Sequence, residues 1–462
     1  MAEGEFPNKS KIGRVTPVHK VGPTDIIDNY RPITVLPIFS KIFERLTFNR
    51  MMDFIKRYEI LSPCQYGFRC GRSTTLAIID LMSHLIPAYH AKVYSACFFL
   101  DLRKAFDTIN HRLLLLKLEH YGFRGHCLNY LRSYYMNRKQ YVYVNGQASD
   151  MMTIAHGVPQ GSILGPLCFN IFINDLPLAV EAHTVLFADD AAFVITAHTL
   201  SELYSRIYKL FADLTTYLNN NLLLANSKKS KLMMFSSRPT RDLPDFVFFG
   251  EKIEWADEIK YLGLTITNRL CFAKHINRVT LNISRITGAL SNLIGIVPMQ
   301  IMIKLYYALA YPHLINHIVI WGSAPTCHLN SLSVRVNNLL RVILGISWTN
   351  GRPTVSTNEM YKSNNFLKIG NSFKLNLFRL LKQLLDGRIP EFFSILMQPY
   401  VTTHSYETRG GVFRHPPLTC EIERRALPHQ LINLFENVPD EILNMNNFAS
   451  INSFKKFLLN NQ

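Results

Sequence analysis

The stretch VLFADDAAFVI, residues 185–195, places two adjacent carboxylates between two apolar runs. The flanks are rich in Val, Ile and Phe, which predicts two short buried strands joined by a tight turn at Asp189 and Asp190. Two carboxylates about 4 Å apart repel by roughly 4 kcal/mol at an effective dielectric of about 20. Such a pair is expected to share a proton or to bind a cation. The alternative for an isolated Asp-Asp pair is a solvent-exposed surface turn.

The composition is that of a globular protein with a polyanionic partner. Of the 462 residues, 48% are hydrophobic and 18% are charged, which excludes a disordered chain. The length predicts two or three domains. The chain has 50 Lys and Arg against 33 Asp and Glu, a formal charge of +17, which favours nucleic acid over a membrane surface as the partner.

The distribution of cysteine and apolar residues excludes several classes of protein. The eight cysteines are scattered without CxxC or zinc-knuckle spacing, which argues against a disulfide framework and against a zinc site. Every apolar run of membrane-spanning length is interrupted by polar residues, and the N-terminus lacks the apolar core of a signal peptide. We therefore expect an intracellular protein with no membrane association.

A third carboxylate follows another buried strand. The run ACFFL, residues 96–100, ends directly at Asp101. If this strand neighbours the 185–195 hairpin in one antiparallel sheet, three carboxylates meet at its edge, where Mg²⁺ would find the oxygen ligands that it prefers. Two such ions about 4 Å apart could activate a 3′-hydroxyl and stabilise a leaving pyrophosphate. The alternative for Asp101 is a cap on the helix behind it.

The remaining patterns predict an α+β region followed by a helical, basic one. Residues 140–154 alternate and contain an Asn-Gly turn, which predicts a hairpin, and KYLGLTIT, residues 260–267, predicts a single strand. Helical periodicity dominates from about residue 268, and a polar segment at 347–365 indicates a boundary.

Seven stretches occur in one order along the chain: NYRPITVLPIFSKIFERL (29–46), QYGFRCGRST (65–74), FLDLRKAFDTINH (99–111), HGVPQGSILGPLCFNIFINDL (156–176), FADD (187–190), NSKKSKLMMF (226–235) and YLGLTIT (261–267). Together they resemble the reverse transcriptase of non-LTR (LINE-type) retrotransposons. The first two resemble its fingers motifs, the third the motif with the first catalytic Asp, and the fourth the motif that positions template and nucleotide. The fifth resembles the catalytic box and the last two the motifs that close the palm.

The resemblance implies a right-hand polymerase that extends a DNA primer on an RNA template with dNTPs and two Mg²⁺ ions, for which Mn²⁺ could substitute. It implies fingers and a palm with an antiparallel sheet over residues 1–267, a helical thumb over 268–346 and a mostly helical C-terminal region over 347–462. It also implies action in the nucleus and cytoplasm. The oligomeric state does not follow from it.

Carried over by position, the family's metal-binding carboxylates are Asp101, Asp189 and Asp190, and the Leu102 carbonyl is a further ligand. Phe106 occupies the place of the aromatic gate that excludes a 2′-hydroxyl, because a rigid ring against C2′ leaves room for hydrogen but not for oxygen. The alternative for Phe106 is a plain core residue.

Further nucleotide contacts are implied at four positions. Gln160 and Gly161 are expected to touch the nucleotide, with turn geometry as the alternative for Gly161. Arg69 is a candidate for the incoming triphosphate, a role that Arg72 could take, and either could hold template phosphates instead. Lys229 stands where the family has a lysine proposed to protonate pyrophosphate, with a solvated basic turn as the alternative.

The basic residues of the helical region could follow the primer-template backbone, or they could be ordinary solvated charges. They are Lys274, His275, Arg278, Arg285 and Lys304.

The main departure from the family is at the N-terminus. The chain lacks the endonuclease that usually precedes this polymerase, and its first residues look like mid-protein sequence, so we expect Met1 to be an internal start or a truncation. Because each catalytic carboxylate is present, an RNA-directed DNA polymerase is the favoured function. The alternative is a catalytically inactive, nucleic-acid-binding remnant of such an element. A group II intron maturase or a telomerase-like polymerase fits the first motif less well.

Overall fold

A computed structural model describes residues 4–238, 243–349, 352–397, 413 and 426–461. These residues form two compact units, the first made of residues 1–77 and 81–256, the second of 78–80 and 257–462. The chain is a mixed α+β protein, which confirms the predicted fold class. No helix in the described part of the chain is both long and apolar enough to cross a membrane.

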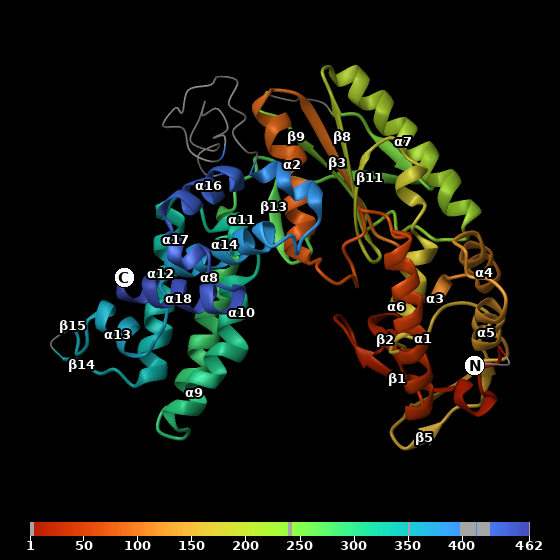
Figure 1. Cartoon of the computed structure of the whole chain (residues 1–462), viewed down its shortest axis with the longest axis horizontal. Coiled ribbons are helices and arrows are strands. Elements are labelled where there is room, and N and C mark those ends of the chain that lie inside the picture. The colour runs from red at the N-terminus through yellow and green to blue at the C-terminus, as the bar shows by residue number, and fades with distance from the viewer. Residues whose placement is uncertain (1–3, 239–242, 350–351, 398–412, 414–425, 462) are drawn as a thin grey trace. The chain divides into compact units, whose positions relative to one another are not determined.

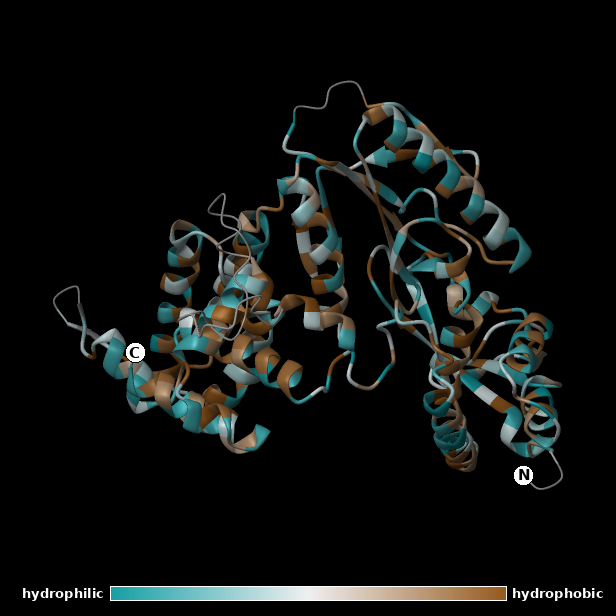
Figure 2. Ribbon diagram, turned by 45° about the horizontal axis from the view of Figure 1, so that its top comes forward, coloured by the Kyte–Doolittle hydropathy of each residue, from teal (hydrophilic) through white to brown (hydrophobic). Residues whose placement is uncertain are grey.

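The first unit is built on a six-stranded sheet in the order β10-β11-β9-β3-β8-β7. Its strands are β3 (Tyr94–Leu100), β7 (His183–Phe187), β8 (Asp190–Ala197), β9 (Lys231–Phe235), β10 (Phe246–Phe248) and β11 (Glu251–Trp255). Strand β3 lies inside the sheet, between β9 and β8. Six of its seven residues are buried, as expected for a strand covered on both faces. Figure 2 shows both brown (apolar) and teal (polar) residues among the strands of the molecule, and β11 itself has three charged residues.

A smaller sheet with the order β2-β1-β4-β5 lies in the same unit, and β6 also pairs with β4. Its strands are β1 (Ile12–His19), β2 (Tyr30–Val35), β4 (Lys139–Val144), β5 (Gln147–Ala148) and β6 (Met152–Thr153). Strand β1 pairs antiparallel with β2 and parallel with β4. The hairpin that the sequence predicts at 140–154 is therefore present, as β4 and its two short partners.

Seven α-helices and three 3₁₀ turns complete the described part of this unit, and Figure 1 shows α7 running along the large sheet. The helices are α1 (Ile38–Arg57), α2 (Thr74–His90), α3 (Ala105–Thr108), α4 (His111–His120), α5 (His126–Tyr135), α6 (Leu164–Phe172) and α7 (Leu200–Asn220), and the turns are η1 (Asn8–Lys11), η2 (Ile27–Asn29) and η3 (Leu176–Leu178). Helix α7 buries an apolar stripe at helical spacing, whereas eight of the nine residues of α6 are buried. An all-round apolar helix of this kind is a core helix.

The second unit is mostly helical. Its helical elements are α8 (Ala273–Ser291), α9 (Met299–Leu305), η4 (Tyr306–Ala310), α10 (Tyr311–Ile315), α11 (Ile318–Trp321), α12 (Thr326–Leu344), α13 (Thr357–Ser363), α14 (Ile369–Leu385), η5 (Glu391–Leu396), α16 (Leu427–Asn437), α17 (Asp440–Leu443) and α18 (Asn447–Asn460). Its strands are β12 (Glu258–Tyr261), β13 (Leu264–Thr267), β14 (Trp348–Thr349) and β15 (Arg352–Pro353). The stretch TRGGVFRHPP, residues 408–417, lies outside the described residues except for Phe413.

One strand prediction is wrong. The run at 260–267 is predicted as a single strand, but it belongs to the β12–β13 hairpin. The chain reverses at Leu262 and Gly263, which have φ angles of 46° and 93°. Glycine adopts such a conformation at no steric cost, whereas Leu262 does so only because the surrounding structure holds it. His317 helps to hold Leu262 in this conformation, since its Nε2 lies 2.8 Å from the Leu262 carbonyl oxygen.

A buried carboxylate joins three helices of the first unit. Glu44 on α1 is 0% exposed and accepts hydrogen bonds from the Tyr134 hydroxyl of α5 and from the Ile163 amide at the start of α6, each at 2.7 Å. An N–H at a helix start has no partner within the helix, so Glu44 supplies one for α6. The Glu44 carboxylate and the two groups that donate to it thus all have hydrogen-bond partners, which offsets the cost of burying these polar groups.

Glu44→Ala should therefore lower the free energy of unfolding by about 2–4 kcal/mol, because it leaves a buried hydroxyl and a buried amide without an acceptor. Glu44→Gln, which keeps one acceptor oxygen, should lose less. Urea denaturation followed by circular dichroism measures both. Glu119→Ala, at an exposed position of α4, is the control and should change little. An equal loss for Glu44→Ala and Glu119→Ala would contradict this role.

Candidate active site

The sheet brings the three predicted carboxylates to one edge. Strands β3 and β8 pair antiparallel, with Leu100 opposite Ala191, so Asp101 follows β3 beside the start of β8. Asp189 lies in the β7–β8 turn, and Asp190 is the first residue of β8. The Asp pair thus lies in a tight turn at the end of two buried strands. Asp101 and Asp189 are half-buried and Asp190 is exposed.

The turn that carries Asp189 is strained and is supported from outside. Ala188 has a φ of 54°, a left-handed conformation that costs a non-glycine residue about 1 kcal/mol. The side-chain oxygen of buried Gln65 accepts hydrogen bonds from the Ala188 amide at 3.0 Å and from the Gly67 amide at 2.8 Å. A Cβ at Gly67 would lie 2.4 Å from the Ala188 nitrogen. The segment around Gly67 therefore packs backbone to backbone against the turn that carries Asp189.

Asp101 is held by the segment that precedes β9. The Asn226 side chain donates to an Asp101 carboxylate oxygen at 2.8 Å, and the Asn226 amide donates to the Asp101 carbonyl at 2.8 Å. The Ser230 hydroxyl accepts from the Asp101 amide at 3.1 Å. Leu102 is buried and forms an isolated antiparallel bridge with Ala225. Nothing in the sequence indicates that Asn226 and Ser230 contact Asp101, because there they belong to a basic turn. Only the folded chain shows these contacts.

The electrostatics of the cluster disfavour three bare negative charges. Burial, followed by the negative charges of Asp189 and Asp101, raises the pKa of Asp190 from 3.8 to about 6, against the opposing charge of Lys20. Although Asp190 is exposed at the edge, the protein beneath it removes part of its water. Burial and the charge of Asp101 likewise raise the pKa of Asp189, while the positive charges of Lys20 and Arg31 lower it. The group is therefore poised to accept cations.

The residues present fit a divalent metal ion. Oxygen-only donors that repel one another, at an edge open to solvent, are the donor set that Mg²⁺ and Mn²⁺ accept. Asn226 orients one of these carboxylates through a hydrogen bond, as ligands in metal sites commonly require. A cation bound here would relieve the repulsion that raises the two pKa values.

The predicted gate residue Phe106 lies on the short helix α3, half-buried against the core. Its ring packs at 4.7 Å from that of Phe169 and at 6.4 Å, edge to face, from that of Phe68. Its carbonyl accepts from the Val158 amide at 2.8 Å, which ties α3 to the turn at 157–161. The ring is thus both a packing residue and a side chain beside the predicted nucleotide turn.

The turn at 157–161 is fixed by contacts within the protein. The Gln160 side chain donates to the Asp107 carboxylate at 2.9 Å, and the Gln160 carbonyl accepts from the Thr34 amide at 2.7 Å. Gly161 has a φ of 126°, and a Cβ there would lie 2.5 Å from the Thr34 carbonyl oxygen. Turn geometry and the approach of β2 are therefore enough to require glycine. Asp107, which sequence reasoning missed, holds Gln160.

Arg69 and Lys229 occupy different environments. The Arg69 guanidinium donates to the Ser62 carbonyl at 2.5 Å and to the Gln65 carbonyl at 3.3 Å, and burial lowers its pKa from 12.5 to about 10. Arg72 donates to the Pro63 carbonyl, so both arginines form hydrogen bonds with backbone carbonyls of the nearby segment 62–65. Lys229 is exposed on the turn that holds Asp101.

In the second unit, three of the five basic residues predicted to follow the primer-template backbone contact the β12–β13 hairpin of this chain. His275 is buried, and its Nδ1 accepts a hydrogen bond from the Thr265 amide at 3.2 Å. The prediction that His275 contacts the primer-template backbone is therefore wrong. Arg278 donates to the Thr265 hydroxyl at 2.7 Å, and Lys274 pairs with Glu258 at 2.7 Å. Arg285 and Lys304 are exposed.

Comparison with known proteins supplies independent information. A sequence profile described as "Reverse transcriptase (RNA-dependent DNA polymerase)" matches residues 18–266, more than half of the chain. The RNA-directed DNA polymerase from mobile element jockey of Drosophila melanogaster is 29% identical over 75% of this chain and 39% of its own length. The probable RNA-directed DNA polymerase from transposon BS of the same species is 28% identical over 73% and 39%. The chain thus spans about two fifths of the length of these curated relatives.

Among solved structures, apo telomerase from Candida tropicalis is similar, with a TM-score of 0.44 and 11% identity over 79% of this chain and 59% of that one.

Gly67→Ala should displace the turn at Ala188, because neither backbone can move away from the added methyl group. We expect a loss of about 1–3 kcal/mol in the free energy of unfolding, as for other overpacked sites. Gly288→Ala is the control, since a Cβ there meets nothing within 4 Å. In the helix it should stabilise by about 0.5–1 kcal/mol. Chemical denaturation measures the free energy of unfolding of both variants. Equal changes in the two variants would contradict the close packing at Gly67.

Asp190→Asn should stabilise the metal-free protein at pH 8. The folded-state pKa of Asp190 lies above its unfolded value of 3.8, so the wild type loses stability as the pH rises from about 4 to 6 and the loss is complete above 6. A shift of two units corresponds to about 2.7 kcal/mol, and the exposure of Asp190 reduces the expected gain to about 1 kcal/mol.

Thermal melts of both proteins at pH 4 and pH 8 measure this difference, which should vanish at pH 4. Added Mg²⁺ should raise the melting temperature of the wild type at pH 8 more than that of the variant. A variant that is no more stable than the wild type at pH 8 would contradict the repulsion.

Proposed function

The chain belongs to the reverse transcriptase family, and from that premise we propose that it is an RNA-directed DNA polymerase that extends a DNA primer on an RNA template. The observation that carries the proposal is the set of carboxylates Asp101, Asp189 and Asp190 at one sheet edge, held by the Gln65 and Asn226 contacts. Two neighbouring segments thus support the position of oxygen ligands that a merely nucleic-acid-binding protein would not need.

The proposed catalytic chemistry is nucleotidyl transfer at these carboxylates, with the Leu102 carbonyl as an additional oxygen ligand. Two bound Mg²⁺ ions, or Mn²⁺ in their place, would supply activation of the primer 3′-hydroxyl and neutralisation of the leaving pyrophosphate. The protein's own contribution is to hold Asp101 in one orientation through Asn226. A carboxylate that needs no reorganisation stabilises charge most effectively.

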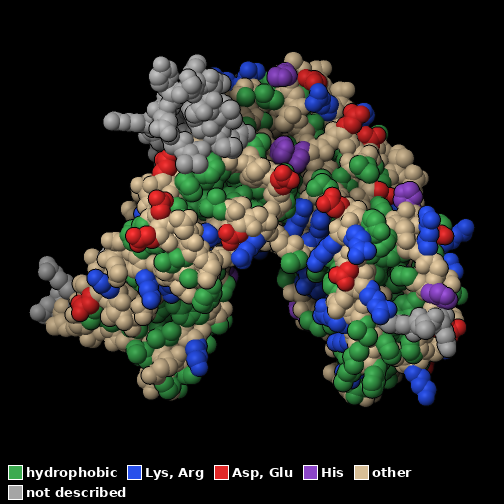
Figure 3. All heavy atoms as spheres, in the orientation of Figure 1, with side chains coloured by type: hydrophobic (Ala, Val, Ile, Leu, Met, Phe, Trp, Pro, Cys, Tyr) green, Lys and Arg blue, Asp and Glu red, His purple; other side chains and the backbone are tan. Residues whose placement is uncertain are grey.

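The proposed ligands are an RNA template, a DNA primer and dNTPs. Lys20 and Arg31 lie close enough to Asp189 to lower its pKa, so they are cations beside the reacting centre. We assign them, with Arg69, to the triphosphate or to template phosphates. Figure 3 shows Lys and Arg side chains gathered around β1, β2 and α1 of the first unit, where a polyanion would bind.

Substrate selection is assigned to the residues around the 157–161 turn. Phe106 would exclude a 2′-hydroxyl from the incoming nucleotide, and Gln160, held by Asp107, would contact that nucleotide together with Gly161. Lys229 would protonate or neutralise the pyrophosphate, since it is exposed on the turn that orients Asp101.

The larger organisation follows the same proposal. Residues 1–267 would be fingers and palm, 268–346 a thumb, and 347–462 a C-terminal region of undetermined role. The His275, Arg278 and Lys274 contacts would hold the β12–β13 hairpin in place at the boundary between the first two. We place the protein inside the cell, in the nucleus and cytoplasm, where such templates and targets occur.

Primer extension on poly(rA)/oligo(dT) with Mg²⁺ tests the proposal. We expect the wild type to incorporate dTTP and Asp189→Ala/Asp190→Ala to lose incorporation by at least about 1,000-fold, because oxygen ligands are removed. Asp150→Ala/Asp245→Ala removes the same formal charge from exposed positions and should retain activity.

A wild type that is folded and binds the RNA–DNA duplex but incorporates no nucleotide would overturn the proposal. That result would favour the catalytically inactive, nucleic-acid-binding remnant instead. Circular dichroism and a filter-binding assay on the same preparations distinguish this outcome from misfolding.

A further inference from the structure

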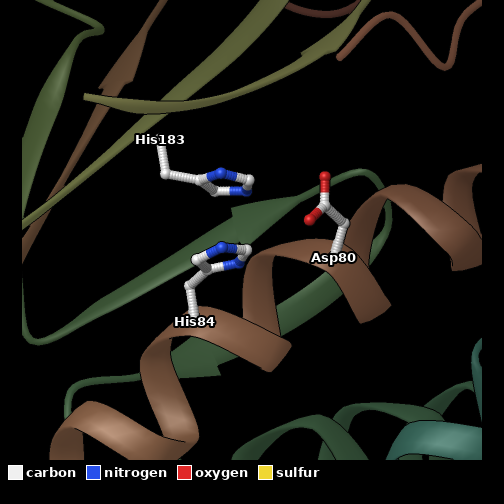
Figure 4. Close-up of side chains that lie close together, drawn as sticks. All are labelled: Asp80, His84 and His183. Atoms are coloured by element: carbon white, nitrogen blue, oxygen red, sulfur yellow. The ribbon is translucent and has the colours of Figure 1, made fainter. Parts of the chain in front are cut away.

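A second group of possible metal ligands lies on helix α2 and strand β7, away from the three carboxylates. Asp80 and His84 are one helical turn apart on α2, so the helix itself places them on one face. His183 is the first residue of β7. One ligand atom from each of the three lies within 4.8 Å of the others, and Figure 4 shows the Asp80 carboxylate beside both imidazole rings.

The two histidines have an arrangement that suits a shared cation. Their rings are stacked with centroids 3.5 Å apart and an interplanar angle of 15°. Two ligand atoms on a tetrahedral Zn²⁺, with bonds of about 2.0–2.1 Å, are separated by about 3.3 Å. The ligand atoms of the group lie within 4.8 Å of one another. Because imidazole lone pairs lie in the ring plane, both stacked rings must rotate about their side-chain torsions to direct a nitrogen at one ion.

The stack would be unfavourable as two imidazolium rings. Aromatic pairs prefer offset or edge-to-face packing, and two positive rings at this separation would repel. Zn²⁺ binds neutral imidazole, so metal binding supplies the positive charge without two ring charges in contact.

The carboxylate of the group is buried on an apolar helix. Asp80 is 3% exposed, and its neighbours on α2 are buried apolar residues: Ala77, Ile78, Ile79, Leu81 and Met82. A carboxylate taken out of water needs a positive or hydrogen-bonding partner. The two imidazoles lie within 4.8 Å of it, and a divalent cation held with them would compensate its charge.

A cavity adjoins the histidines and leaves room for a further ligand. It has a volume of about 530 Å³ and is lined by both histidines and, among others, by Glu181, His198 and Arg206. Glu181 already pairs with Lys209 at 2.6 Å, and Arg206 pairs with Glu202 at 2.7 Å. Water or the exposed His198 would therefore complete a four-coordinate site.

We propose that Asp80, His84 and His183 form a Zn²⁺ site that ties helix α2 to β7, the edge strand of the large sheet. Two nitrogen donors with one carboxylate favour Zn²⁺ over Mg²⁺, which prefers oxygen ligands. The cysteine spacing argues against a zinc site made of cysteines, and this one uses none. Along β7, His183 lies four residues before the end of the strand, about 14 Å from the turn that carries Asp189.

The experiment is Zn²⁺ binding to the full chain, measured by isothermal titration calorimetry and by metal analysis after dialysis. We expect one equivalent bound in the wild type, and His84→Ala or His183→Ala to weaken the affinity by at least about 100-fold. His156→Ala, at an exposed position elsewhere in the first unit, is the control. Asp189→Ala/Asp190→Ala should bind Zn²⁺ like the wild type, which separates this site from the polymerase proposal.

Thermal melts keep the test independent of folding defects. Zn²⁺ should raise the melting temperature of the wild type and of His156→Ala but not of His84→Ala, whose side chain is exposed and whose metal-free fold circular dichroism checks. Co²⁺ substitution should give a visible absorption band from a low-symmetry site with nitrogen ligands in the wild type and in His156→Ala but not in His84→Ala. Absence of Zn²⁺ binding in the wild type, or wild-type affinity in His84→Ala and His183→Ala, would overturn the proposal.

Discussion

The hydrogen bond from the Ala188 amide to Gln65 is the interaction on which the candidate active site depends. The hairpin between β7 and β8 must turn tightly enough to present Asp189 and Asp190 at the sheet edge, and it does so with Ala188 at a positive φ. A buried glutamine from a segment more than a hundred residues earlier supplies the partner for that amide. Since Gly67 admits no side chain beside the same turn, the close approach of these segments is a backbone constraint.

The other sequence motifs are connected to this turn and to one another. The segment before β9 holds Asp101 through Asn226 and Ser230, while the 157–161 turn contacts β2 at Thr34 and helix α3 through Asp107. Each of these segments therefore supplies a hydrogen-bond partner for a polar group of another.

The β7–β8 hairpin also separates two kinds of cation chemistry. Its turn carries oxygen donors that suit Mg²⁺, whereas the first residue of β7 contributes a nitrogen donor to the group with His84 and Asp80. Ligand type rather than affinity alone separates the two ions, because hard oxygen sites and mixed nitrogen sites select different metals. A structural ion at the edge strand would stiffen the same sheet that presents the carboxylates.

The sequence by itself determined the α+β class, the buried strands at β3 and β7–β8 and the acidic residues that follow them, because runs of apolar residues that end at a carboxylate are a local pattern. Family resemblance added the roles proposed for those residues. Only the tertiary structure decided that Gln65, Asn226 and Asp107 hold the site, that residues 260–267 form a hairpin and that His275 is buried. It also brought His183 to His84. Such partners are set by the packing of distant segments, which leaves no periodic or composition signal in the chain.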